Sequence, residues 1–432
     1  MHRQTDTTRI ARTGGNQALD LVKGFIRMSH NGRAGSEFKA LQLSSAFQPI
    51  FSIAHRRAVG YEALLRARDN QGNPVSPLQV FAMASAGPEL TRLDRLCRTL
   101  HVHNFQTTAA DNHWLFLNVN PAVVVHGKSY GAFFAEMLDH YAFPAHRIVV
   151  EILEETIRDE SLLTEAVEYY RRLGCLVAID DFGSGHSNFE RIWRVSPDIV
   201  KLDRSLILQA AAKKKARRVL PSLVSLLHEA GCLVLMEGVE TQEEALISMD
   251  ADVDFVQGYY FGKPAADLEM APDSACSLAV LCDKFKSMVA AEARSQREGT
   301  GAYIAGFLRC VEMLRVGVSL ERACAGFLAK TGIERCYVLS VDGAQIGANQ
   351  TSPLRPARTD RRFAALEDVN GARWFRRTYF RRALVQPGQV QMSRPYLSLT
   401  GAHMCVTLSI ALEVDGETRV FCCDLNWEMM AG

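Results

Sequence analysis

The sequence predicts an α/β fold: a (β/α)8 barrel whose first strand pair is antiparallel, followed by a smaller C-terminal α+β domain. The 432 residues are more than one domain of about 150 to 250 residues needs. Short β-rich segments alternate with helical segments up to about residue 270, whereas a helix followed by strands occupies the remainder. The predicted parts are an N-terminal arm or helix, the barrel, a helical connector and the C-terminal domain, at residues 1–41, 42–270, 271–300 and 301–432.

The N-terminal arm holds seven Lys and Arg against three Asp and Glu, around one apolar stretch with helical spacing at residues 19–26. It is predicted to be a short amphipathic helix on a loose arm. A solvated tail or a packing helix is the ordinary interpretation of this charge, and contact with a membrane or a partner is the alternative.

Eight β-rich segments are the predicted barrel strands: 46–53, 58–66, 115–120, 147–153, 176–181, 198–203, 233–239 and 254–261. Longer helical segments between most of them, such as 162–173 and 216–230, imply parallel pairing with right-handed crossovers. Eight strands over about 220 residues fit a closed barrel better than an open sheet. Only four residues separate the first two strands, which is too short for a crossover, so that pair is predicted to be antiparallel.

The connector, residues 271–297, is predicted to be a helix with apolar residues in a 3-4-3 spacing that docks on a neighbouring domain, since two heptads are too few for a coiled coil. A second helix over 304–328 then precedes β-like segments at 335–341, 389–393, 403–413 and 418–424. This order predicts the α+β domain.

The composition is that of a folded protein with a sizeable core, 48% hydrophobic and 22% charged. A net charge of +1 gives no overall positive field, so we expect no DNA binding. No apolar run reaches about 18 residues, and residues 1–40 lack a secretory signal, so we expect a cytoplasmic protein with no transmembrane segment. The eleven cysteines never form C-x-x-C, which favours buried, reduced thiols.

Most predicted barrel strands carry a metal-type oxygen ligand or a charged group near the C-terminal end. In a parallel barrel these ends converge on one mouth. Any one such residue alone is more often a helix cap or an ion-pair member, but a series flanked by apolar residues indicates a site. Its members are Glu62, Asn118, Glu151, Asp180, Asp181, Lys201, Asp203, Glu237 and Gln257.

Five carboxylates in one mouth would repel one another unless cations neutralised them. Oxygen ligands without a His or Cys cluster favour Mg²⁺ or Mn²⁺, with Ca²⁺ as an unproductive substitute. The adjacent Asp180 and Asp181 could bridge two ions about 4 Å apart, which suits in-line displacement at phosphorus. Lys201 could orient or deprotonate the attacking water, or stabilise the transition state. One Mg²⁺ with a lysine base that abstracts a proton next to a carboxylate, as in enolase-type barrels, is the alternative.

Seven motifs between residues 42 and 266 resemble, in order, those of the EAL-domain family of cyclic di-GMP phosphodiesterases. They are Glu62-Ala63-Leu64-Leu65-Arg66 preceded by Phe47-Gln48-Pro49-Ile50, Asn118-Val119-Asn120-Pro121, Glu151-Ile152-Leu153-Glu154, Asp180-Asp181-Phe182-Gly183-Ser184-Gly185, Lys201-Leu202-Asp203, Glu237-Gly238-Val239-Glu240-Thr241 and Gln257-Gly258-Tyr259. The resemblance implies a TIM-like barrel (the EAL fold), a homodimer, and hydrolysis of cyclic di-GMP to linear pGpG. It also implies two Mg²⁺ or Mn²⁺ ions per site and inhibition by Ca²⁺.

The resemblance further implies roles for single residues. Glu62, Asn118, Glu151 and Asp180 would hold one metal, and Asp180, Asp181 and Glu237 the second. Lys201, Glu237 and Glu62 would be catalytic, with Lys201 at the nucleophilic water and Arg66 at a substrate phosphate. Gln48, Asp203 and Gln257 would contact the substrate or support the site. Glu154 would pin the loop after the fifth strand, and Glu240 would support the ligands from behind.

A non-catalytic receptor that binds cyclic di-GMP and signals to a protein partner is the competing interpretation. Degenerate members of the family usually lose metal ligands, and this sequence retains them. It departs from the family pattern at Asn120, Ser184 and His186, where Ser, Thr and an aromatic residue are usual.

The C-terminal domain resembles a PAS/Cache-type sensory fold, which implies that it regulates the barrel by binding an unknown small ligand or a protein. Trp374, Phe375 and Tyr396 could line a ligand pocket, with Arg373 or Arg394 fixing an anion. Ordinary packing of core aromatic residues is the alternative.

Overall fold

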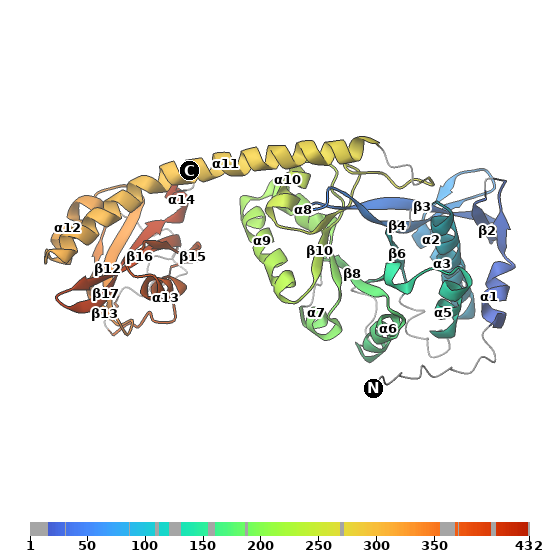
Figure 1. The fold of residues 1–432 in the computed structure, drawn as a ribbon, viewed down its shortest axis with the longest axis horizontal. Helices are drawn as coiled ribbons and strands as arrows, with labels where there is room; N and C mark the ends of the chain where they lie inside the picture. The colour runs from blue at the N-terminus through green and yellow to red at the C-terminus, as the bar shows by residue number, and fades with distance from the viewer. Residues whose placement is uncertain are drawn as a thin grey trace, which may run out of the picture. The chain divides into compact units, whose positions relative to one another are not determined.

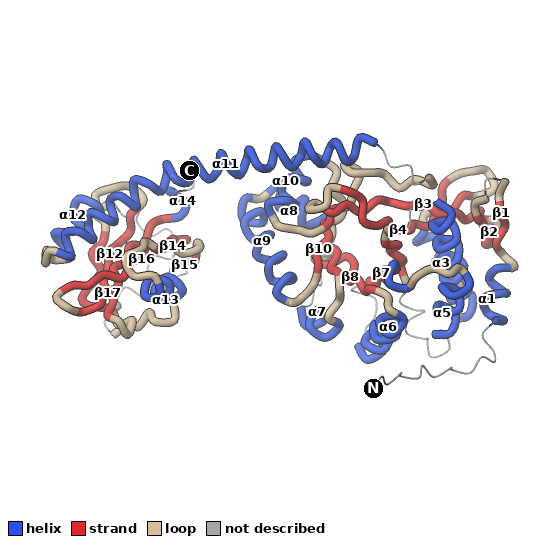
Figure 2. The backbone as a smooth tube through the Cα atoms, in the orientation of Figure 1, coloured by secondary structure: helices blue, strands red, loops and turns tan. Residues whose placement is uncertain are grey.

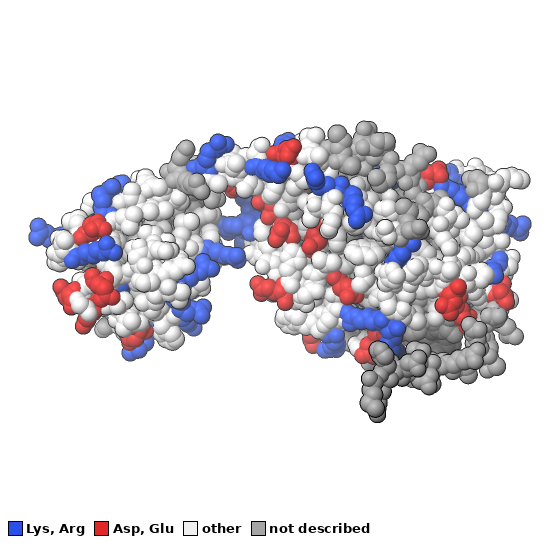
Figure 3. Space-filling view, in the orientation of Figure 1, with Lys and Arg blue, Asp and Glu red and all other residues white. Residues whose placement is uncertain are grey.

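The computed structural model describes residues 16–30, 32–85, 87–108, 112–120, 131–153, 160–185, 189–267, 272–354, 368–369, 371–398 and 403–430. The chain divides into two compact units, Met1–Lys286 and Ser287–Gly432. Figures 1 and 2 show the elements of both. On the face drawn in Figure 3, basic and acidic side chains are interspersed over each unit.

The first unit is built on a closed ring of eight strands. These are β3 (Leu41–Ser52), β4 (Arg57–Arg68), β6 (Trp114–Asn118), β7 (Ile148–Leu153), β8 (Leu176–Phe182), β9 (Ile199–Leu202), β10 (Leu233–Met236) and β11 (Phe255–Val256). Strand β3 pairs antiparallel with both β4 and β11, and the other neighbours pair parallel. The predicted barrel with an antiparallel first pair is therefore confirmed.

Helices connect the parallel strands and cover the outside of the ring (Figure 1). They are α2 (Pro77–Met83), α3 (Pro88–Thr108), α5 (Gly131–His140), α6 (Glu160–Leu173), α7 (Phe189–Val195), α8 (Arg204–Ala212), α9 (Lys214–Glu229) and α10 (Gln242–Asp250), with a 3₁₀ turn, η2, at Ala145–Arg147. Their apolar faces pack on the outward side chains of the strands in one large core. A separate cluster fills the ring with side chains from seven strands: Ile50, Phe116, Val149, Ala178, Ile199, Leu235 and Phe255.

The predicted short amphipathic helix is present as α1 (Asn16–Lys23), which packs on the barrel unit through Leu19 and Val22. The described residues around it are not a loose arm: strands β1 (Ile26–Met28) and β2 (Ala34–Phe38) extend the sheet antiparallel beyond β3 (Figure 2). Strand β5 (Pro74–Val75) adds a short pairing to β4. Strands β1 and β2 were not predicted, because neither lies in a β-rich run that ends near a polar group.

The second unit is an antiparallel sheet with helices, which confirms the predicted α+β domain. Its strands are β12 (Ile333–Ser340), β13 (Gln345–Thr351), β14 (Gln391–Met392), β15 (Tyr396–Leu397), β16 (Met404–Val414) and β17 (Glu417–Asn426). The order in the sheet is β13-β12-β17-β16-β14, and β15 also pairs with β16. Helices α13 (Thr378–Val385) and α14 (Trp427–Met430) complete this part.

A single helix, α11 (Pro272–Arg315), runs where two helices were predicted. Gly299 and Gly301 lie inside it, each at a cost of about 1 kcal/mol relative to Ala, which 44 residues of helix can absorb. The helix ends at Arg315, two residues before Gly317 with its left-handed φ of +79°, and α12 (Leu320–Leu328) follows.

The two faces of the C-terminal sheet carry different cores. Phe307 and Val311 of α11, with Phe327 of α12, pack on one face. Tyr379 and Phe380 of α13 pack on the other. All ten cysteines among the described residues are free and nine of them are buried, so the prediction of buried, reduced thiols is confirmed for these. No helix among the described residues is long and apolar enough to cross a membrane.

Candidate active site

The polar residues of the barrel mouth lie one layer above the apolar cluster that fills the ring. Because side chains alternate along a strand, residues two apart point to the same side. Glu151 follows Val149 by two residues, and five other strands repeat this spacing with Asn118 after Phe116, Asp180 after Ala178, Lys201 after Ile199, Glu237 after Leu235 and Gln257 after Phe255. Strand β3 runs the opposite way, so its member of the layer, Gln48, precedes Ile50 by two.

Lys201 lies at the centre of this layer and is 1% exposed. Its Nζ is 2.6 Å from Glu151 Oε1, 2.7 Å from Glu237 Oε1 and 3.1 Å from Asp180 Oδ1. Glu62 Oε2 is farther away, at 3.8 Å. Four carboxylates from four different strands therefore surround one cation.

Glu62 is held by two amide side chains, and a third, Gln48, supports one of these two. Asn118 Nδ2 donates to Glu62 Oε1 at 3.0 Å, and Gln257 Nε2 donates to Glu62 Oε2 at 2.6 Å. Gln257 also donates to Gln48 Oε1 at 3.2 Å, and Gln48 Nε2 donates to the Gly262 carbonyl at 3.1 Å. This chain fixes the orientation of the Glu62 carboxylate.

A turn at the end of β8 brings Asp181 toward the same mouth. Asp181 has a left-handed backbone, φ +59°, and its N–H donates to Asp180 Oδ1 at 3.0 Å. Gly183 follows with a φ of +101°, and a Cβ there would collide with Leu206 of α8. As a result, one carboxylate oxygen each from Asp180, Asp181 and Glu237 lie within 4.8 Å of one another.

The electrostatics of this cluster are those of a site with too little positive charge. Burial raises the pKa of Glu151 well above its ordinary value, even though Lys201 opposes this. Burial also raises the pKa of Glu237 to about 8 and, together with Asp180, that of Asp181 to about 6. Burial acts to lower the pKa of Lys201, but the surrounding carboxylates, Asp180 foremost, hold it well above normal. Without further cations, these carboxylates retain protons at pH values where carboxylates are normally ionised.

The residues present fit divalent metal ions. All the candidate ligands are oxygen atoms, as Mg²⁺, Mn²⁺ and Ca²⁺ prefer. Oε2 of the buried Glu151 and Oε1 of the buried Gln257 have no hydrogen-bond partner among the described residues. Buried carboxylate oxygens are seldom left in this condition, so a ligand is expected there.

Other residues that were predicted for the site make different contacts. Asp203 caps α8 by accepting from Ser205 N–H at 3.0 Å, and Glu240 forms an ion pair with Arg204. Arg66 lies at the end of β4 and donates to the Leu65 carbonyl at 3.0 Å. Glu154 and His186 lie outside the described residues.

Sequence reasoning missed Arg204 and Leu206, which hold the two loops that carry Glu237 and Asp181. Gly238, with a φ of +65°, packs so closely on Arg204 that a Cβ would collide with it. The glycines in both loops were visible in the sequence, but their packing partners come from α8, a helix with no chemical motif.

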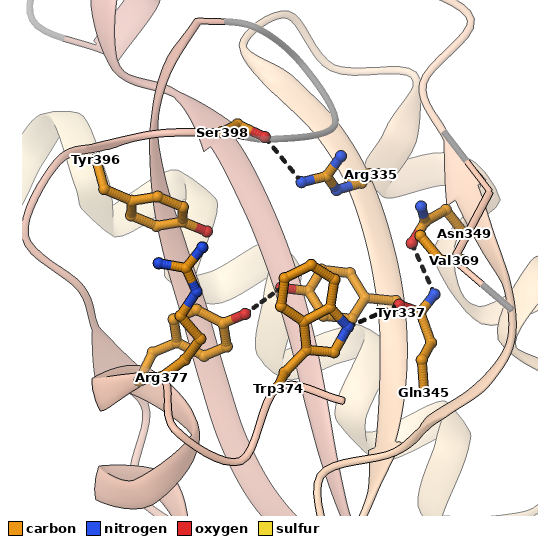
Figure 4. A pocket seen from close by; sticks show the side chains of 10 residues that line it. Arg335, Tyr337, Gln345, Asn349, Val369, Trp374, Arg377, Tyr396 and Ser398 are labelled. Atoms are coloured by element: carbon orange, nitrogen blue, oxygen red, sulfur yellow. Dashed lines mark hydrogen bonds between the residues drawn. The ribbon is translucent and has the colours of Figure 1, made fainter. Parts of the chain in front are cut away.

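Only some of the C-terminal residues that were predicted for a ligand pocket lie together. Trp374 and Tyr396 line a pocket together with Arg335 and Arg377 (Figure 4). Phe375 is exposed, and Arg373 pairs with Asp342 at 3.2 Å. Arg394 lines an adjoining groove.

The mouth of the barrel is thus an oxygen-rich candidate cation site around a buried lysine, on a barrel whose first strand pair is antiparallel. Residues 33–264, more than half of the chain, match the EAL domain family, and the chain belongs to that family. The predicted resemblance is confirmed.

Several relatives are named cyclic di-GMP phosphodiesterases. The probable cyclic di-GMP phosphodiesterase PdeN of Escherichia coli is 28% identical over 55% of this chain and 46% of its own length. The cyclic di-GMP phosphodiesterase PdeF of the same organism is 27% identical over 50% of this chain and 29% of its own length. This chain therefore spans less than half of either relative.

One solved structure resembles nearly the whole chain in fold. The Bacillus subtilis YkuI protein, with an EAL domain and in complex with cyclic di-GMP and calcium, superposes with a TM-score of 0.74. The likeness covers 89% of this chain and 96% of that one at 23% identity. It therefore concerns the fold, including the C-terminal sheet domain.

Proposed function

We propose that this protein hydrolyses one phosphodiester bond of cyclic di-GMP and releases linear pGpG. The observation that carries the proposal is the complete layer of oxygen ligands around Lys201, in a chain that belongs to the EAL domain family. The names of PdeN and PdeF favour a phosphodiester substrate over the carbon acid of an enolase-type barrel.

The mechanism depends on two divalent cations, which when bound would polarise the phosphate and acidify the attacking water. Glu62, Asn118, Glu151 and Asp180 would hold one ion, and Asp180, Asp181 and Glu237 the other. Mg²⁺ or Mn²⁺ would support turnover, whereas the larger and more flexibly coordinated Ca²⁺ would bind unproductively.

The side chains of the mouth have separate tasks in this mechanism. The surrounding carboxylates hold the pKa of Lys201 well above normal. This favours a role in which Lys201 orients the attacking water and stabilises charge on the transferred phosphoryl oxygens over one in which it removes a proton. Glu237 and Glu62 lie 2.7 and 3.8 Å from the Lys201 ammonium group and would help to hold it in place. Arg66 would contact the second phosphate of the substrate, and Gln48 and Gln257 would limit how deeply the dinucleotide enters.

Product analysis tests the proposal directly. The full chain is incubated with cyclic di-GMP and Mg²⁺ or Mn²⁺, and pGpG is followed by chromatography. We expect turnover that EDTA abolishes. Retained binding of cyclic di-GMP without any pGpG would show a receptor instead, and contradict the enzyme assignment.

We also propose that the C-terminal unit regulates the barrel and that the protein is a homodimer. Helix α11 contributes residues to both units, so it offers a physical route for this regulation. Light scattering of the full chain checks the dimer, and comparison of turnover with and without a ligand of the C-terminal unit checks the regulation.

A further inference from the structure

The face of the C-terminal sheet that carries α13 contains a buried row of polar side chains. Arg335, Asp424 and Thr407 are cross-strand neighbours on β12, β17 and β16. Arg335 forms an ion pair with Asp424, and Thr407 Oγ1 donates to Asp424 Oδ1 at 2.7 Å. Tyr337 OH donates to the same oxygen at 3.3 Å. Buried ion pairs seldom add stability over apolar packing, so this row indicates a role other than stability.

Arg335 and Tyr337 of this row line a small pocket (Figure 4). Its own free volume is about 10 Å³, room for about one water molecule, so a larger ligand would have to extend into the groove that adjoins it. The described residues that line the pocket are Arg335, Tyr337, Gln345, Asn349, Val369, Trp374, Arg377, Tyr379, Tyr396 and Ser398. None of them is acidic, and the combination of aromatic faces with a few polar groups is typical of small-molecule sites.

The two arginines of the pocket are not equivalent. Arg335 is neutralised by Asp424 and donates to Ser398 Oγ at 3.0 Å. The guanidinium of Arg377 has no hydrogen bond and no carboxylate partner among the described residues. It lies 5.2 Å from the ring centre of Tyr396 and 5.9 Å from that of Trp374. Two aromatic rings therefore hold a cation at the pocket while its N–H donors stay available.

The groove that adjoins the pocket is lined by further positive charge. It shares Arg377, Tyr379 and Tyr396 with the pocket, and Arg382 and Arg394 also line it. No described residue that lines the groove is acidic. Clustered charge of one sign raises the local concentration of counter-ions, so an anion is favoured at this entrance.

We propose that this groove, which shares Arg377 with the pocket, binds a small organic carboxylate, and that Arg377 holds it through the two parallel N–H groups of its guanidinium. A planar carboxylate matches this donor pair. The groove has a free volume of about 380 Å³, and the apolar part of the ligand would lie along it against Met392 and Tyr396. The sequence had suggested Arg373 or Arg394 for this task, but Arg373 is paired with Asp342, and Arg394 lacks the two aromatic rings that hold Arg377.

Direct binding to the full chain tests this proposal independently of barrel activity. The probes are mono- and dicarboxylates of two to six carbon atoms, each paired with its neutral amide, and inorganic phosphate. Binding is measured by titration calorimetry and by the shift in melting temperature. We expect at least one carboxylate to bind the wild type while its amide does not.

Three variants connect this binding to Arg377. Arg377→Gln removes the charge and should weaken the bound carboxylate by about tenfold or more, the loss expected for a charge-assisted pair. Arg377→Lys keeps the charge without the paired donors, so its affinity for the carboxylate should lie between those of the wild type and Arg377→Gln. Arg376→Gln is the matched control, because the neighbouring arginine lines neither the pocket nor the groove, and it should bind as the wild type does. Circular dichroism confirms that each variant is folded.

The proposal is overturned if no carboxylate of the panel binds the wild type, or if Arg377→Gln binds as tightly as Arg376→Gln. Binding of phosphate in place of every carboxylate would also overturn it.

Discussion

At the scale of single residues, the barrel mouth concentrates negative charge around one buried ammonium group. Asp180 is the member shared by the two proposed ion positions, since it contacts Lys201 and also lies beside Asp181. Asp181 makes no ion pair with Lys201 within 4 Å and groups only with Asp180 and Glu237, so we expect it to serve the second position alone. The ligands are therefore not interchangeable, and variants should separate the two positions.

Asp181→Asn should reduce the number of Mn²⁺ ions bound per chain from two to one. Asp180→Asn should weaken the binding of both ions, because Asp180 is shared by the two positions. Calorimetric titration of Mn²⁺ into the full chain measures this. Glu168→Gln is the control, because Glu168 is an exposed residue of α6 that pairs with Arg172 and is no candidate ligand. Equal loss of Mn²⁺ in Asp181→Asn and Glu168→Gln would contradict the assignment.

Glu62→Ala should lower turnover chiefly by weakening one ion, because it removes a ligand held by Asn118 and Gln257. Excess Mn²⁺ should then restore part of the lost rate. Full activity of this variant in Mg²⁺ would show that Glu62 is not a ligand.

Buried His101 makes the stability of the barrel unit depend on pH. Burial, reinforced by Arg66, lowers its pKa to about 3, and its Nδ1 lies 2.8 Å from Ser45 Oγ. In the unfolded chain His101 takes up a proton near its normal pKa of about 6.5, whereas in the folded chain it stays neutral. The contribution of His101 to the free energy of unfolding is therefore complete above pH 6.5 and declines as the pH falls toward 3. The slope from this group approaches about 1.4 kcal/mol per pH unit.

Urea unfolding of the wild type and of His101→Phe at several pH values measures this contribution. As the pH is lowered from 7 to 4.5, the wild type should lose more free energy of unfolding than His101→Phe does. A difference that is constant over this range would show that His101 titrates normally in the folded state.

At the scale of elements, the turn after β8 carries the catalytic geometry. Gly183→Ala should cost about 1 to 3 kcal/mol and reduce turnover, because its backbone is left-handed and its Cβ would meet Leu206. Gly72→Ala is the matched control: Gly72 has a φ of +85° but nothing within 4 Å of a new Cβ. We expect Gly72→Ala to lose a similar free energy of unfolding through its backbone while turnover stays unchanged. Equal turnover in both variants would show that the turn after β8 does not affect catalysis.

The same scale explains which elements could be predicted. Each of the eight ring strands lies in a β-rich run that ends near a polar group, and the predicted boundaries lie within about five residues of the observed ones. Strands β1 and β2 were not predicted, because neither lies in such a run and Ala34–Phe38 has only one large apolar residue. Arg377 was missed because its partners, Trp374 and Tyr396, come from separate segments that meet only in the folded sheet.

At the scale of the whole molecule, a chain with a net charge of +1 carries two sites of opposite character. The barrel mouth is acidic and suits cations, whereas the C-terminal groove has an unpaired arginine and suits an anion. The total charge describes neither site.

A crystal of the full chain soaked with cyclic di-GMP and Ca²⁺ tests the central claim most directly, since Ca²⁺ should occupy the ion positions without turnover. We expect two Ca²⁺ ions, one bound by Glu62, Asn118, Glu151 and Asp180 and the other by Asp180, Asp181 and Glu237, with a substrate phosphate bridging them. Cyclic di-GMP bound at the mouth with no ion between it and these carboxylates would contradict the account.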